Sequence, residues 1–267
     1  MNGVNEWDFP NTATQPGSAA YYVVRFSPSD RRHGLARWFA WFAHIDAIAA
    51  KASDPGAARL KLDWWREEAH MMLQGQARHP LARALSAQIT MEQQVAQIRQ
   101  ALQAIEGRIL RRQPGTLSDF HQQCSEQYAS RLYLLCGKQD KHPGIETLGR
   151  HIGISSRLSQ LKDDVRDNYL SLPADLVRQF KLGMDELENT HQPEALRELA
   201  STLFDSTAPL GPTELQTLAS DETLRPAVRF AAQSLRLQHL MEKHRFNPNR
   251  KYRLTPIGLL WSAWRMR

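Results

Sequence analysis

Cysteine is scarce in this chain, since only Cys124 and Cys136 occur among 267 residues. They are twelve positions apart in a stretch with helical periodicity, and the helical rise would hold them about 18 Å apart. That separation excludes a disulfide between them, and their spacing matches no zinc motif. We therefore expect reduced thiols and a cytoplasmic protein.

Long apolar runs are also missing. No window reaches the roughly 18 uninterrupted apolar residues needed to span a membrane, and the first twenty residues lack the basic start and apolar run of a secretory signal. Sustained alternation of period two is absent, whereas apolar residues recur at helical spacing. The sequence therefore predicts a soluble, all-α protein that at most touches a membrane from outside.

Positive charge exceeds negative charge: the net charge is +6 and the isoelectric point is near 9.5. This bias favours phosphates, anionic lipid or nucleic acid as partners. The basic residues are scattered rather than gathered in one stripe, which counts against nucleic acid. Residues 1–17 are polar and carry prolines, so we expect a loose lead-in, followed by one helical domain over 18–267.

Several predicted helices have clear start and stop signals. Asp54 and Pro55 precede a helix that Gly75 closes, and Gly137 ends the helix predicted over 117–136. Capping boxes are expected where Thr90 precedes Gln93 and where Thr116 precedes Asp119. The helix near residues 30–51 has a wide apolar face, which predicts a buried position. Its aromatic residues either line a cavity or, as the likelier alternative by about three to one, fill the core; they are Trp38, Trp41 and Phe42.

An acidic helix end follows in LGRHIGISSRLSQLKDDVRDNYLSLP, residues 148–173. Asp163, Asp164 and Asp167 share roughly one helical face there, and like charges at this spacing repel. A divalent metal ion would relieve that repulsion. Lys162 and Arg166 interleave with the acids, however, and an ordinary solvated helix end gives the same pattern. The local sequence leaves both interpretations open.

Several segments resemble the squalene/phytoene synthase family in their order along the chain. They are SAAYYVVRFSP, LKLDWWREEAHMMLQGQARHPLARAL and the acidic segment above. The resemblance implies an all-α isoprenoid-synthase (terpenoid synthase) bundle, with a central cavity between the helices of residues 30–51 and 145–168. In active members, two Asp-rich motifs hold Mg²⁺, which binds the diphosphate of farnesyl or geranylgeranyl diphosphate and assists its departure.

The resemblance also implies roles for particular residues. It assigns catalysis to Asp46 and Asp164, and magnesium binding to Asp46, Asp163, Asp164 and Asp167. It implies that the substrate contacts Tyr22, Arg25, Lys51 and Gln160.

The first Asp-rich motif is degraded, because HIDAIAAK over residues 44–51 keeps Asp46 but has Ala47, Ala50 and Lys51 where acids are expected. Arg108 likewise replaces an acid of active enzymes. A lysine can meet phosphate directly as a point charge. We therefore expect a protein that binds a prenyl diphosphate but is catalytically weak or inactive. The alternative is a working Mg²⁺-dependent head-to-head prenyl transferase.

Two further segments look more like a non-catalytic branch of this superfamily, exemplified by a mitochondrial assembly factor of respiratory complex I. They are QCSEQYASRLYLL and LTPIGLLWSAWRMR. This likeness raises an assembly-factor role and contact with a respiratory complex. The basic, aromatic C-terminal segment either touches membrane lipid or a partner protein, or packs as a helix through Trp261 and Trp264.

Overall fold

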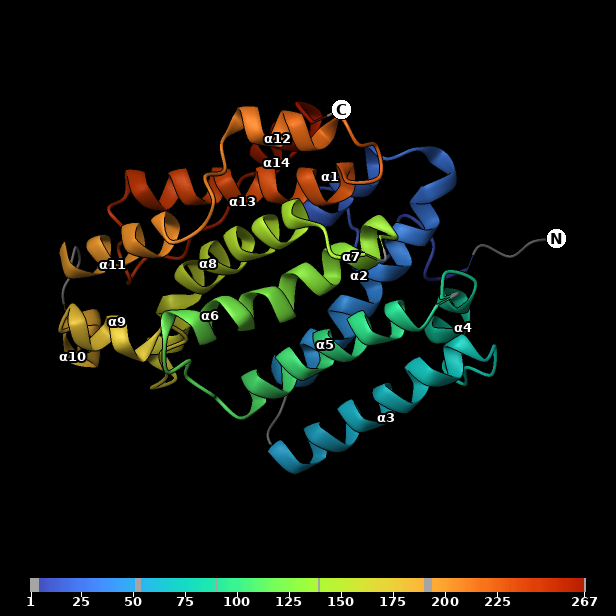
Figure 1. Cartoon of the computed structure of the whole chain (residues 1–267), viewed down its shortest axis with the longest axis horizontal. Helices are drawn as coiled ribbons and strands as arrows, with labels where there is room; N and C mark the ends of the chain where they lie inside the picture. Colours follow the sequence, from blue (N-terminus) through green and yellow to red (C-terminus); the bar gives the residue numbers. More distant parts are fainter. Residues whose placement is uncertain (1–4, 51–53, 90, 139, 190–193, 267) are drawn as a thin grey trace.

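The computed structural model describes residues 5–50, 54–89, 91–138, 140–189 and 194–266 (Figure 1). Every regular element within these ranges is a helix, which confirms the predicted all-α class. None of the described helices is both long and apolar enough to cross a membrane. The helices are α1 (Ala19–Arg25), α2 (Ser29–Ala50), α3 (Pro55–Leu73), α4 (Pro80–Ser86), α5 (Glu92–Ile109), α6 (Leu117–Cys124), the π-helical turn η1 (Ser125–Ala129), α7 (Ser130–Cys136), α8 (Pro143–Arg166), α9 (Ala174–Gln179), α10 (Met184–Asn189), α11 (Glu194–Asp205), α12 (Pro212–Ala219), α13 (Arg225–Lys243) and α14 (Pro256–Trp264).

The helix ends follow the local signals in most cases. The Asp54 carboxylate accepts hydrogen bonds from the first amides of α3, and Thr116 and Asp119 form the expected capping box of α6. Gly137 takes a left-handed conformation with φ of 66° after α7. At α5, Thr90 lies outside the described residues. The Gln94 side chain accepts from the Met91 amide there, one position later than the predicted box.

Helices α6, η1 and α7 follow one another without a break, and α8 packs closely against them. Two glycines of α8 permit this approach. A Cβ atom on Gly149 would lie 2.7 Å from the backbone nitrogen of Ala129, and one on Gly153 would lie 2.6 Å from Cys124 Cβ. The other side of α8 contacts α13, which runs beside it in Figure 1. These contacts hold α8 between α13 and the continuous α6–η1–α7 segment.

The core has two parts. The larger part gathers the apolar faces of α2, α3, α5 and α7, and the smaller part lies beneath the second half of α8 with α9 to α11. Trp38 and Trp41 are fully buried in the larger part and meet edge to face at 5.9 Å. These two aromatic residues therefore fill the core, which was the favoured alternative. Cys124 and Cys136 are buried and free, as expected.

The segment before α1 packs on α2 over residues 5–17. The Asn11 side chain donates hydrogen bonds to the carbonyl oxygens of Trp7, at 2.7 Å, and Ala36, at 3.0 Å. Thr14 is fully buried and its hydroxyl donates to Asn11 Oδ1 at 3.1 Å. The polar side chains of this segment thus make internal hydrogen bonds that join it to α2.

Candidate functional site

A cavity of about 760 Å³ opens between α2 and α8, where the sequence predicted it. α2 contributes Asp46 among small residues, and α8 contributes Ile152, Ser156, Ser159 and Gln160. Among the described lining residues, Asp46 is the only acid, while Arg108, Arg131 and Arg253 are basic. The lining is therefore net positive. The remaining lining residues are Ala19, Ala43, Ala47, Ala50, Gln127, Tyr128, Phe230, Gln233, Ser234, Leu237, Tyr252, Leu254 and Leu259.

Asp46 is held by two arginines at the cavity wall. Arg131 donates to both of its carboxylate oxygens, at 2.8 and 2.9 Å, and Arg108 donates to Asp46 Oδ1 at 3.0 Å. The Arg131 guanidinium also lies 5.3 Å from the centre of the Phe42 ring, a cation–π contact that fixes its position. The result is a rigid cluster of two cations and one anion, contributed by α2, α5 and α7.

The charges of this cluster perturb one another. Burial by itself would raise the pKa of Asp46, but the neighbouring charges and hydrogen bonds of Arg131 and Arg108 outweigh burial and lower that pKa. Burial would conversely lower the pKa of Arg131, and Asp46 raises it instead. Asp46 and Arg131 therefore stabilise each other's charged forms.

The α8 wall offers neutral groups to the cavity. Tyr128 donates a hydrogen bond to Ser156 Oγ at 2.5 Å, and Gln160 Nε2 donates to the same oxygen at 3.1 Å. Ser159 donates to the Ser156 carbonyl oxygen at 2.8 Å. Hydroxyl and amide groups can orient a polar ligand, but they supply no negative charge to balance a cluster of metal ions.

The three aspartates of the acidic α8 end do not belong to the described cavity lining. Asp163 pairs with Arg166 at 3.1 Å and Lys251 at 3.2 Å, and Asp167 pairs with Arg166 at 3.0 Å. Asp164 accepts a hydrogen bond from Ser171. Burial raises the pKa of Asp164, although Ser171, Arg157 and Arg108 partly oppose the shift. The solvated-end alternative thus describes Asp163 and Asp167, whereas Asp164 is turned inward.

The other residues predicted to contact a substrate are dispersed. Gln160 lines the cavity, but Tyr22 and Arg25 are not among its described lining residues. The Tyr22 ring packs against Tyr21 at 5.3 Å and Phe26 at 6.5 Å, and Arg25 is exposed at the end of α1. Lys51 lies outside the described residues. The cavity therefore brings together Asp46 and Gln160 from the predicted set.

The side chains present do not fit a resident magnesium cluster. Mg²⁺ requires oxygen ligands in near-octahedral geometry, yet both oxygens of Asp46 already accept hydrogen bonds from guanidinium groups. Across the described ranges, no group of three or more His, Cys, Asp or Glu side chains could hold a metal ion.

Arg131 was not predicted from the sequence as a cavity residue, and neither was the pairing of Arg108 with Asp46. Arg131 was overlooked although it stands within the otherwise apolar run of α7, where a buried guanidinium requires an acidic partner. Arg108 was noticed as the replacement of an acid, but its pairing with Asp46 joins helices 62 positions apart. The lone charge in an apolar helix was the available signal for Arg131.

These features define a class: an all-α bundle that encloses a cavity between two long helices. A solved structure described as a dehydrosqualene synthase in complex with ligand has the same fold. The TM-score is 0.75 with 15% sequence identity, and the match covers 92% of this chain and 90% of that one. No curated protein matches the chain.

Residues 13–257 match the squalene/phytoene synthase family. The chain belongs to that family, as the sequence motifs indicated.

Proposed function

We propose that this protein binds a prenyl diphosphate in the α2–α8 cavity through arginine side chains, and that it turns the substrate over weakly or not at all. The observation that carries the proposal is the pairing of Asp46 with Arg108 and Arg131. A guanidinium group is well suited to phosphate oxygens because its donors form a planar fork. The diphosphate would lie beside these two arginines.

The rest of the cavity suits an isoprenoid chain. Ile152, Phe230 and Leu237 contribute apolar surface from α8 and α13, and Leu254 and Leu259 add more from the C-terminal segment. A volume of about 760 Å³ lies within the usual range for small-molecule sites. An apolar chain would be removed from water there, while its charged head stays near the arginines.

Weak turnover follows from the same electrostatics. Loss of diphosphate from a prenyl group needs positive charge that stabilises the leaving group more in the transition state than in the ground state. Here Asp46 already neutralises part of the arginine charge. The polar groups that the α8 wall adds to the lining are only hydroxyls and an amide, since Asp163, Asp164 and Asp167 are not among the described lining residues. The cavity therefore retains the binding of a prenyl diphosphate more readily than the departure of its diphosphate group.

The test is a binding titration with farnesyl and geranylgeranyl thiodiphosphate, unreactive analogues, carried out once with EDTA and once with Mg²⁺. We expect the dissociation constants to agree within about twofold, because arginines supply the head-group contacts. A parallel incubation with the authentic diphosphates and Mg²⁺ should release little pyrophosphate.

The competing function is an active Mg²⁺-dependent prenyl transferase. Binding that requires Mg²⁺, together with pyrophosphate release that disappears in Asp164→Ala, would establish it and overturn our proposal. An assembly-factor role stays a prediction of the sequence likeness.

A further inference from the structure

The C-terminal helix α14 carries most of its large apolar side chains on the outside, while Leu259 lines the α2–α8 cavity. Ile257, Leu260, Trp261 and Trp264 are spaced three and four positions apart, so they share one face, and all four are exposed. Ile257 is 79% exposed. The buried residues of α14 are small, namely Gly258, Ser262 and Ala263. We call the four exposed residues the α14 stripe.

The inner face of α14 packs closely against α13. A Cβ atom on Gly258 would lie 3.2 Å from Arg236 Nε, so the Arg236 side chain of α13 lies directly against the backbone of α14. The Thr255 hydroxyl accepts a hydrogen bond from the Gly258 amide and caps the helix. The α14 stripe lies outside these buried contacts. Large exposed apolar patches of this kind mark interaction surfaces.

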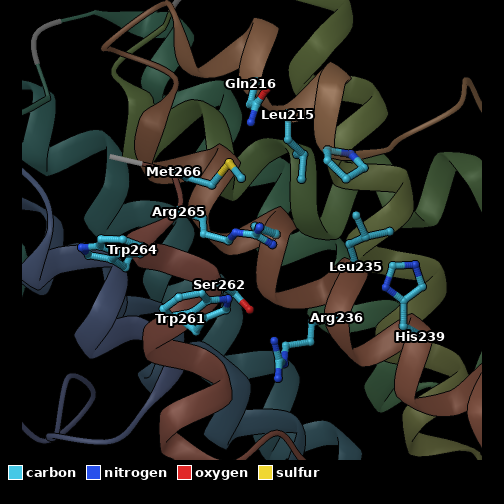
Figure 2. A pocket seen from close by; sticks show the side chains of 12 residues that line it. Leu215, Gln216, Leu235, Arg236, His239, Trp261, Ser262, Trp264, Arg265 and Met266 are labelled. Carbon is cyan, nitrogen blue, oxygen red and sulfur yellow. The ribbon is translucent and has the colours of Figure 1, made fainter.

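A groove of about 540 Å³ runs beside the stripe between α12, α13 and α14 (Figure 2). Trp261 and Trp264 stack on its α14 side with ring centres 5.2 Å apart, while Leu215 and Leu235 face them from α12 and α13. Figure 2 shows Arg265 reaching into the groove. The guanidinium of Arg265 lies 5.8 Å from the centre of the Trp261 ring. The groove thus combines an apolar floor with a cation.

Charge identifies the kind of partner. The described groove lining contains Arg236, His239 and Arg265 but no Asp or Glu. The sequence from 243 to the end carries seven Lys or Arg residues and no acid. Tryptophan beside arginine or lysine is typical of protein surfaces that lie in the head-group region of a bilayer. Each basic residue near an anionic leaflet adds attraction.

We infer that the α14 stripe and its basic surroundings dock this protein peripherally on a membrane surface rich in anionic phospholipid. Trp261 and Trp264 insert at the level of the lipid head groups, and Arg236 and Arg265 meet lipid phosphates. The cavity-lining residues Leu254 and Leu259 belong to the same C-terminal segment, so docking would place the cavity near the source of apolar ligands. The docking itself does not depend on the proposed prenyl diphosphate binding.

The experiment is co-sedimentation of the full chain with vesicles, without any prenyl ligand. Vesicles of pure phosphatidylcholine are compared with vesicles that contain one part phosphatidylglycerol to three parts phosphatidylcholine. We expect binding to the anionic vesicles that falls about tenfold in the Trp261→Ala/Trp264→Ala variant, and a similar fall in Arg236→Gln/Arg265→Gln. High salt should weaken wild-type binding, because lipid charge is screened.

Leu60→Ala is the matched control, since Leu60 is 72% exposed on α3, away from this surface. It should bind like the wild type. Ile257→Asp is a second test of the stripe, in case a tryptophan variant unfolds. The Ile257 side chain points to solvent, so this variant should fold, and it should also bind the anionic vesicles more weakly than the wild type. Circular dichroism checks the fold of each variant. Equal binding to both vesicle types, absence of wild-type binding, or equal loss in Leu60→Ala would overturn the inference. A protein partner would then be the better occupant.

Discussion

The aspartates on the α2 side and on the α8 side of the cavity lie in opposite environments. On α2, Asp46 faces the cavity but shares both oxygens with Arg108 and Arg131. On the α8 side, Asp163 and Asp167 form ion pairs with Arg166 near the surface, and the polar groups that α8 gives to the cavity lining are serines and a glutamine. A count of acids in the sequence gives four candidate ligands. The structure shows that four carboxylates need not provide one shared site.

The difference lies in what neutralises each carboxylate. The partners of Asp46 are fixed by neighbouring helices, so its charge is balanced inside the cavity before any ligand arrives. The partners of Asp163 and Asp167 are exposed, and pairs of that kind contribute little free energy. The α2 side should therefore respond strongly to mutation of its basic partners, and the α8 side weakly.

The largest effect should come from moving the α8 wall itself. Gly149→Ala places a Cβ atom 2.7 Å from the backbone nitrogen of Ala129, and backbone cannot yield as a side chain can. We expect a loss of about 3 kcal/mol in the free energy of unfolding, together with weaker ligand binding. Urea denaturation and analogue titration measure the two effects.

Gly107→Ala is the control for that change. A Cβ atom on Gly107 would meet no atom within 4 Å. Alanine is the better helix former, so stability should stay equal or rise by up to about 1 kcal/mol. Equal destabilisation by both substitutions would show that the close approach of α8 to η1 is not what fixes the wall.

Arg131→Gln tests the α2 side. The Arg131 side chain is 11% exposed, and its loss leaves half-buried Asp46 with Arg108 as the remaining partner. We expect a loss of about 2 kcal/mol in unfolding free energy and about tenfold weaker binding of prenyl thiodiphosphate.

Arg166→Gln is the matched change on the α8 side, where the arginine is 65% exposed. It should alter unfolding free energy by less than about 0.5 kcal/mol and leave binding unchanged. A larger effect than that of Arg131→Gln would reverse the comparison between the walls.

The pH dependence of stability should have opposite signs at Asp46 and Asp164. The lowered pKa of Asp46 means that its stabilising contribution is present above the ordinary aspartate pKa, about 3.9, and is lost as pH falls through the folded-state value. The raised pKa of Asp164 means that the wild type loses stability as pH rises from that ordinary value through the folded-state value.

Thermal unfolding between acid and neutral pH resolves these two contributions. With increasing pH, the wild type should gain stability relative to Asp46→Asn and lose stability relative to Asp164→Asn. Parallel curves for the two variants would contradict the assigned environments.

Much of the fold could be predicted because its signals are local. Asp54, the Thr116–Asp119 pair and Gly137 each act within a few residues. Helical periodicity predicted the helices themselves, and the family resemblance placed α2 and α8 at the cavity. The capping box predicted at Thr90 and Gln93 stays a prediction, because Thr90 lies outside the described residues; beside it, Gln94 accepts from the Met91 amide.

The site was harder to predict because its charges come from distant parts of the chain. The Asp46–Arg131 pair spans 85 positions, and periodicity says nothing about such a pairing. Likewise, the spacing of Asp163, Asp164 and Asp167 gives a shared helical face, but the direction of that face depends on how α8 is rotated against η1 and α13. The outward apolar stripe of α14 also required the structure, because a helix packed through Trp261 and Trp264 has the same sequence pattern.

The most direct test of the central claim is the affinity of Asp46→Asn for farnesyl thiodiphosphate in the presence of EDTA, measured well below the unfolding temperature. If arginines hold the diphosphate, removal of the competing carboxylate should leave binding equal to or tighter than that of the wild type. If Asp46 instead anchors the ligand through metal ions, the wild type should bind poorly in EDTA, recover with Mg²⁺, and lose that recovery in Asp46→Asn.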